Sequence, residues 1–469
     1  MLPPFGNANY LREIEERLLE APEDVNLLYQ RAGMLDLLGR NDEARDAYIA
    51  VIKREPAHLG ALGSLGTLLF NAGYRSAARL TYGEALKHHP RDVTTLINFA
   101  NALFENDELA AARSVYESAL EVDAGAAPAH QGLSHVLDRL GENEAAERHR
   151  QAGFAAMPVS VEAYRGSGLP VSVLILSSAR KGNVPIDVPL DDATFLKIKL
   201  FTDYYDPQLP LPPHDVIFNG IGDADLCKPS LDAAEALLRR HGAAALNPPE
   251  CVRETGRAAM AAKLRGIAGL IVPRIVEIGR GEIDTVDTFP ALVRPPGYHT
   301  GEFFERVSDR AELKRLAPTL PGEKLLVIEQ LDARAADGFH RKYRFLAIGG
   351  RLYPVHLARS SHWKVHYFSA DRVRDPEAIA EEDAFLTDPR AAIGERAMAV
   401  IGAAIERIGL DYCGIDFALD AAGNVLFFEG NATMRAVVPV AGDGSQAKRA
   451  AAVTANRAFR DMVLRTGAA

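Results

Sequence analysis

Three oxygen-bearing side chains near the C-terminal end have the types and spacing to bind one divalent cation. Asp416 lies in the apolar segment GIDFAL, and Glu429 and Asn431 lie in the apolar segment VLFFEGN. A glycine-containing turn at 422–424 separates the segments, which predicts a β-hairpin. Glu429 and Asn431 are two residues apart, so their side chains share one face of the strand, and Asp416 can lie opposite them. Oxygen ligands of this kind suit Mg²⁺.

A different interpretation puts both carboxylates on the solvent-exposed face of an ordinary hairpin. The surrounding residues are apolar, however, and a carboxylate without a partner in such surroundings is costly. The metal site is therefore the favoured interpretation.

Strands and helices alternate in the segment before this hairpin. VSVLILSS (171–178) and DVIFNGIG (215–222) have the length and apolar character of buried strands, and PSLDAAEALLRRHG (229–242) has the pattern of a helix ended by glycine. This order predicts a small parallel α/β unit over about 170–250. After residue 251 strands dominate, with helices expected near 390–408 and 445–464.

The first third of the chain repeats every 34 residues. Alanine recurs at 44, 78, 112 and 146, and tyrosine at 48, 82 and 116, with Arg150 in the fourth copy. Small residues recur at 32, 66, 100 and 134, and proline at 56, 90 and 158, with Ala124 in the third copy. Small residues allow two helices to approach closely, the tyrosine fills the space between pairs, and proline ends each unit.

This pattern resembles the tetratricopeptide repeat (TPR) family over about residues 23–158, with an extra helix at 7–21. The resemblance implies an all-α TPR solenoid over 1–158, whose groove binds a peptide or protein partner. A packing or dimerisation module with an empty groove is the alternative.

The hairpin pattern D-x(12)-E-x-N resembles the ATP-grasp ligases, and that resemblance covers roughly residues 170–465. It implies that Asp416 and Glu429 hold Mg²⁺ on the phosphates of ATP and that Asn431 completes the ligand set. The implied architecture is a multidomain chain. After the solenoid and a linker at 159–170, it has an α/β pre-ATP-grasp domain at 171–250 and an α+β ATP-grasp fold at 251–469.

The resemblance also assigns residues to the phosphates. Lys263 corresponds to the first basic residue on the ATP phosphates, and Arg294 stands where the second, usually lysine, is expected. The segment PPGYHTGEFF (295–304) is similar to the loop that closes over the phosphates. Within it Gly301 lets the backbone approach the anion, and His299 is either a donor to it or an ordinary loop histidine.

The nucleoside part has its own expected residues. The segment VIEQLD (327–332) is similar to the hinge between the two lobes, where Glu329 and the backbone near Leu331 would meet the adenine edge. The family commonly has an acidic residue for the ribose where this chain has Lys342, so Asp337 in the preceding loop is the substitute candidate.

The remaining candidates are cationic. Arg344 resembles the family residue that contacts phosphate or the acyl intermediate. The segment HLARSSHWKVHYF (356–368) corresponds to one that supplies positive groups to phosphate and acceptor, which implicates Arg359, Lys364 and His366. A solvated loop with ordinary charges is the alternative for this segment.

The resemblance to the ATP-grasp family implies an Mg²⁺- and ATP-dependent ligase that joins a carboxylate to an amine through an acyl phosphate. Its substrates would be small molecules or peptides, as in peptide modification or natural product biosynthesis. Two alternatives stay open: an ATP-grasp kinase acting on a small molecule, and a non-catalytic nucleotide-binding scaffold.

Composition limits the partners. The formal net charge is -10 and the pI about 5.8, which disfavours non-specific binding to nucleic acid or anionic membranes. The three cysteines are scattered, and no secretory leader or membrane-spanning stretch is recognisable. We therefore expect a cytoplasmic protein that binds neither nucleic acid nor membrane, and a homodimer stays open.

Overall fold

The structure is a computed structural model that describes residues 4–166, 168–298, 301–365, 375–438 and 445–467. The chain forms two compact units. The first, the repeat unit, contains Met1–Val173 and Asp191–Asp206, and the second, the pocket unit, contains Leu174–Leu190 and Pro207–Ala469.

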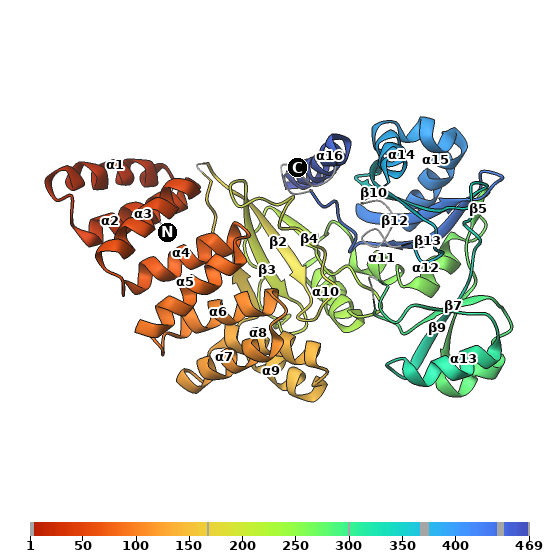
Figure 1. Cartoon of the computed structure of the whole chain (residues 1–469), viewed down its shortest axis with the longest axis horizontal. Coiled ribbons are helices and arrows are strands. Elements are labelled where there is room, and N and C mark those ends of the chain that lie inside the picture. The colour runs from red at the N-terminus through yellow and green to blue at the C-terminus, as the bar shows by residue number, and fades with distance from the viewer. Residues whose placement is uncertain (1–3, 167, 299–300, 366–374, 439–444, 468–469) are drawn as a thin grey trace. The chain divides into compact units, whose positions relative to one another are not determined.

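The described part of the repeat unit is built mainly from consecutive helices, shown in Figure 1. They are α1 (Pro4–Glu20), α2 (Val25–Leu37), α3 (Asn41–Arg54), α4 (Leu59–Asn71), α5 (Arg75–His88), α6 (Val93–Glu105), α7 (Leu109–Val122), α8 (Ala127–Leu140) and α9 (Asn143–Ala156). From α2 onward they pack in pairs, α2 with α3, α4 with α5, α6 with α7 and α8 with α9. The predicted helix pairs are confirmed.

The recurring small and aromatic residues form the core of these pairs, as predicted. Tyr48, Tyr82 and Tyr116 are almost completely buried, and so is Arg150, which takes the tyrosine position in the last pair. A methyl group added at Gly66 would lie 2.5 Å from the Tyr82 ring. The small residue is therefore required for the tyrosine to fit between its two helices.

The turn between the two helices of a pair requires a left-handed backbone. Gly39, Gly73 and Gly141 supply it, with φ between 70° and 84°. In the third pair Asp107 stands at the same repeat position and adopts φ 64°. Aspartate is among the few other residue types that adopt this conformation readily.

The segment predicted as a linker packs against the repeats. It contains β1 (Val159–Val161), which pairs antiparallel with β3 (Phe195–Phe201). Phe154 of α9 contacts Phe201 edge to face, with ring centroids 4.5 Å apart. Arg165 donates from Nη1 to Asp36 Oδ1 over 2.5 Å. The segments after the repeats are thus tied to both the last and the first helix pair.

The pocket unit combines helices with two sheets of its own. Strand β2 (Val171–Ser177) enters it from the repeat unit, and β4 (Val216–Asn219) is its neighbour. The first helices are α10 (Lys228–His241), α11 (Pro249–Arg253) and α12 (Arg257–Leu264). Helix α10 ends at Gly242 in the left-handed conformation, as predicted.

One sheet has the strand order β6-β9-β7-β8. Its strands are β6 (Ile275–Gly279), β7 (Ala291–Arg294), β8 (Glu305–Val307) and β9 (Lys324–Glu329), with short helices η1 (Arg280–Thr285), α13 (Arg310–Leu316) and η2 (Ala317–Thr319) beside them. The predicted hinge at 327–332 begins in the last residues of β9.

The other sheet has the order β11-β10-β12-β13-β5. Its strands are β5 (Leu270–Ile271), β10 (His340–Ile348), β11 (Arg351–Ser360), β12 (Tyr412–Leu419) and β13 (Val425–Asn431), and the later helices are α14 (Pro376–Thr387), α15 (Pro389–Ile408) and α16 (Gln446–Gly467). An aromatic layer joins it to α14, because Phe385 meets Tyr343 and Phe345 edge to face. This layer fixes one face of the sheet and leaves the other for polar side chains.

Within the described residues, no helix combines the length and apolar character needed to cross a membrane.

Candidate functional site

A row of polar residues crosses four neighbouring strands of the five-stranded sheet. Arg344 of β10 pairs with His356 of β11 on one side and with Asp416 of β12 on the other, and Asp416 pairs with Glu429 of β13. Directly paired residues place their side chains on the same face of a sheet. The predicted metal residues Asp416 and Glu429 therefore lie side by side, and Asn431 follows two residues later on the same strand face.

Asp416 is held by two cations. Arg344 donates to its carboxylate from Nε over 2.5 Å and from Nη2 over 2.7 Å, and Lys342 Nζ lies 3.1 Å away. The side chain is almost completely buried. Burial alone would raise the pKa of Asp416, but the charges of Arg344 and Lys342 hold it well below its usual range. The carboxylate is therefore ionised and fully compensated.

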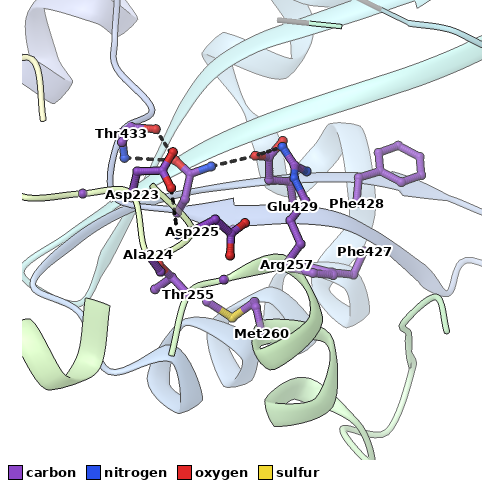
Figure 2. A pocket seen from close by; sticks show the side chains of 14 residues that line it. Asp223, Ala224, Asp225, Thr255, Arg257, Met260, Phe427, Phe428, Glu429 and Thr433 are labelled. Atoms are coloured by element: carbon purple, nitrogen blue, oxygen red, sulfur yellow. Dashed lines mark hydrogen bonds and ion pairs between the residues drawn. The ribbon is translucent and has the colours of Figure 1, made fainter. Parts of the chain in front are cut away.

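Glu429 and Asn431 are also engaged by protein groups. Arg257 Nη2 and Asn431 Nδ2 donate to the same oxygen of Glu429, over 2.7 and 2.8 Å. The side-chain oxygen of Asn431 accepts bonds from the backbone N and the hydroxyl of Thr433, over 2.9 and 2.8 Å. Figure 2 shows this chain of contacts along the pocket wall. The structure thus places the three predicted ligand residues together, each with a protein partner.

A small pocket lies against this end of β13, and its empty volume is about 390 Å³ when the adjoining open solvent is included. Its walls come from the loop after β4, the start of α12 and the end of β13. They comprise Gly222, Asp223, Ala224, Asp225, Thr255, Gly256, Arg257, Met260, Phe427, Phe428, Glu429, Gly430, Asn431 and Thr433. Two of the predicted metal residues, Glu429 and Asn431, line it.

The loop at 222–225 is shaped for this position. A methyl group added at Gly222 would lie 2.9 Å from the Thr433 methyl group, so only glycine allows the loop to approach β13 this closely. The Asp223 carboxylate accepts from the backbone N of Asp225 and of Leu226, both over 2.9 Å. Asp223 and Asp225 both line the pocket, and neither was predicted as a site residue.

Arg294 is a buried cation whose hydrogen bonds are incomplete. It is 5% exposed, and its Nε and Nη2 have no hydrogen-bond partner among the described residues. Burial, reinforced by the positive charge of Arg257, lowers its pKa to about 10, while Glu429, Asp225 and Asp223 oppose that shift. Leaving guanidinium N–H groups buried and unbonded is costly. The site is therefore suited to an anion that would bond them.

Helix α12 presents a different basic residue to the pocket than the one predicted. Lys263 bonds Glu254 over 2.5 Å and the backbone oxygen of Ile408 over 3.1 Å, whereas Arg257 lines the pocket. The two are six positions apart, which rotates their side chains by about 240° around the helix. Arg257 is the first residue of α12 and follows the N-cap residue Gly256.

The predicted nucleoside residues lie around the hinge. Glu329 accepts from the backbone N of Arg274 over 2.9 Å. Leu331 packs in a small apolar cluster with Ala333, Ala418, Leu426 and Phe428. Asp337 is exposed, and hydrogen bonds from Arg341 hold its pKa well below its usual range. Leu331 thus shares a cluster with Phe428, a residue of the pocket wall, while Glu329 and Asp337 are engaged by neighbouring residues.

Phe304, which the sequence did not single out, connects several predicted residues. Arg294 lies over its ring at 5.4 Å, and Lys364 donates from Nζ to its backbone oxygen over 2.9 Å. A methyl group added at Gly301 would lie 3.4 Å from the Lys364 side chain. Arg294, Gly301 and Lys364 are therefore gathered on Phe304. The predicted His299 and His366 lie outside the described residues.

Arg359, unlike Arg294 and Lys364, contacts acidic side chains and not Phe304. Its guanidinium lies over the Phe339 ring at 3.9 Å, and both terminal nitrogens are 3.5 Å from one oxygen of Glu377. Asp375 and Glu381 lie at 3.9 Å. These contacts attach β11 to the start of α14.

No protein-family model and no curated protein matches the chain. Solved structures match about a third of it. MamA from Desulfovibrio magneticus is 21% identical over 32% of this chain and 85% of that chain, with a TM-score of 0.30. A tetratricopeptide repeat protein from Parabacteroides merdae is 17% identical over 32% and 60%, with a TM-score of 0.30. YrrB, described as a TPR protein with an unusual peptide-binding site, is 17% identical over 33% and 79%, with a TM-score of 0.29. The 34-residue period and the helix pairs make the N-terminal helices of this chain consistent with a TPR solenoid, which mixed α/β sheets follow.

Proposed function

We propose that the pocket unit is an Mg²⁺- and ATP-dependent ligase that joins a carboxylate to an amine. The observation that carries the proposal is the buried, incompletely bonded guanidinium of Arg294, within electrostatic reach of the charges that line the pocket. A phosphate oxygen would supply the acceptor that its N–H groups lack. This is the fit expected of a site for a nucleotide's phosphates.

Arg257 is the second residue suited to the phosphates. It now neutralises Glu429, and a phosphate in the pocket would offer it a second anionic partner. Glu429, Asn431 and Asp416 form the oxygen set that would hold Mg²⁺, since two carboxylates and an amide on one face of the sheet fit a hard cation. Bound Mg²⁺ would neutralise charge on the transferring phosphoryl group.

The proposed reaction has two steps. A carboxylate oxygen of the first substrate attacks the γ-phosphorus of ATP, an O–P bond forms, the bond to the β-phosphate oxygen breaks, and ADP leaves. The amine nitrogen then attacks the acyl carbon, inorganic phosphate leaves, and the nitrogen loses a proton as the amide forms. Arg294 and Arg257 would stabilise the negative charge in the first step.

The repeat unit would serve recognition. A solenoid of helix pairs presents an extended surface that typically binds a peptide or a protein segment. We therefore propose that the acceptor or donor is carried on a peptide or peptide-like molecule that the repeats recruit.

The test is ADP release from the full chain with mixed carboxylates, amines and peptides, followed by mass spectrometry of the products. We expect ADP formation that requires both substrates, an amide product, and a loss of about 100-fold in Glu429→Gln. Glu277→Gln is the matched control, because Glu277 is also a strand carboxylate paired with one cation, Lys324. A stable phosphorylated product without amine dependence would favour a kinase. Turnover that persists in Glu429→Gln would contradict the assignment of Glu429 to the metal site.

A further inference from the structure

The carboxylates assigned to the metal are already neutralised by the protein. Asp416 has Arg344 and Lys342 within 3.1 Å, and Glu429 has Arg257 at 2.7 Å. The side-chain oxygen of Asn431 accepts two bonds from Thr433. The three oxygen-bearing side chains are thus close together, and each of them already has a protein partner.

A divalent cation approaching this set meets three positive side chains as well as two carboxylates. Its binding is weak while these side chains stay in place, and a guanidinium that leaves a buried carboxylate needs another anion. Arg344 opposes metal binding most strongly, because it donates hydrogen bonds to Asp416 from two nitrogens. A nucleotide's phosphates are anions of the required kind and charge.

Resting on the function proposed above, we propose that these ion pairs keep the metal site closed, so that free divalent cations bind weakly and bind tightly only with nucleotide phosphates present. Arg344 and Arg257 would turn from Asp416 and Glu429 to the phosphates, and the oxygens that they release would be available to hold the metal. Lys342 is a positioning residue in this scheme, since its ammonium group helps hold Asp416 in the closed arrangement. It has no part in the two proposed reaction steps.

Lys342 provides a test of the proposal in which a substitution should strengthen metal binding instead of weakening it. Arg344 and Arg257 belong to the phosphate-binding set, so their loss would weaken binding for several reasons. Lys342 lies two positions before Arg344 on the same strand face and contacts Asp416 only through a point charge. Removing that charge should make the ligand-free site more attractive to a cation.

The experiment measures Mn²⁺ binding by electron paramagnetic resonance and water-proton relaxation. For the wild-type full chain without nucleotide, we expect binding no tighter than that of Asp416→Asn. With a non-hydrolysable ATP analogue, we expect a ternary complex that Asp416→Asn weakens. In Lys342→Gln without nucleotide, Mn²⁺ affinity should rise about tenfold, because one positive charge near the cation is gone. Adding Asp416→Asn to that variant should abolish the gain.

Lys324→Gln is the matched control, because this strand lysine also pairs with a single carboxylate, Glu277, at the surface. It should leave Mn²⁺ binding unchanged. Trp363 fluorescence reports whether each variant folds. If Lys342→Gln does not fold, Lys342→Met is used in its place. The inference would be overturned if the wild type without nucleotide bound Mn²⁺ through Asp416 as tightly as Lys342→Gln does. An unchanged Mn²⁺ affinity in Lys342→Gln would overturn it as well. If no ternary complex forms in the wild type, the proposed function falls together with it.

Discussion

The repeat unit and the five-stranded sheet bury side chains of opposite character at recurring positions. In the repeats, neutral tyrosines and small residues recur every 34 residues, and they stabilise the fold mainly by apolar packing, to which hydroxyl hydrogen bonds such as Tyr82–Thr67 add. In the sheet, the row of His356, Arg344, Asp416 and Glu429 places charges where apolar residues would be at least as stable. The row therefore carries a stability cost that most of the repeat core avoids, as expected if it has the binding role proposed above.

The repeat unit contains its own exception. In its last helix pair Arg150 occupies the tyrosine position, 1% exposed, and bonds Asp138 over 2.5 Å. A buried charge in the repeats can therefore be compared directly with a buried charge in the sheet.

Two substitutions test this contrast, and Arg344→Met should cause the larger loss of stability. It leaves the carboxylate of Asp416 buried with only Lys342 beside it, so we expect a loss of about 3 kcal/mol in the free energy of unfolding. Urea unfolding followed by Trp363 fluorescence measures it in the pocket unit. Arg274→Met is the control, because its pair with Asp287 is exposed and should contribute less than about 1 kcal/mol. A loss in Arg344→Met no greater than in the control would break the comparison.

Arg150→Tyr should have the smaller effect. It restores the residue found in the other helix pairs, and Asp138, which is 22% exposed, can be hydrated when the arginine is gone. We expect the free energy of unfolding to change by no more than about 1 kcal/mol, in either direction. Urea unfolding followed by far-ultraviolet circular dichroism measures it, with wild type alongside. A loss as large as that of Arg344→Met would mean that buried charges in the two regions are equivalent.

The repeats could be predicted closely because their information is local and repeated. The 34-residue spacing of Ala, Tyr and small residues identified the helix pairs, and the glycines Gly39, Gly73 and Gly141 marked the turns between paired helices. The strand at 195–201 that joins the repeat unit was not anticipated, because its pairing with β1 depends on residues far away in the chain.

The site could be predicted in part. The two-residue spacing of Glu429 and Asn431 and the hairpin before them placed three oxygen ligands on one face, as the register shows. The partners of those ligands could not be predicted. Arg344 is 72 positions from Asp416 and Arg257 is 172 from Glu429, and only the tertiary fold brings such distant residues together. The choice of Arg257 over Lys263 follows from the rotation of α12, which a single sequence does not specify.

The central claim is that the pocket beside Arg294 receives the phosphates of a nucleotide, and calorimetric titration tests it most directly. A non-hydrolysable ATP analogue with Mg²⁺ would be titrated into the wild-type chain, Arg294→Met and the exposed-arginine control Arg274→Met. We expect saturable binding to wild type and to the control, and an affinity at least about tenfold weaker in Arg294→Met, since its charged hydrogen bonds to phosphate are lost. Absence of binding to wild type, or equal binding to all three proteins, would contradict the account.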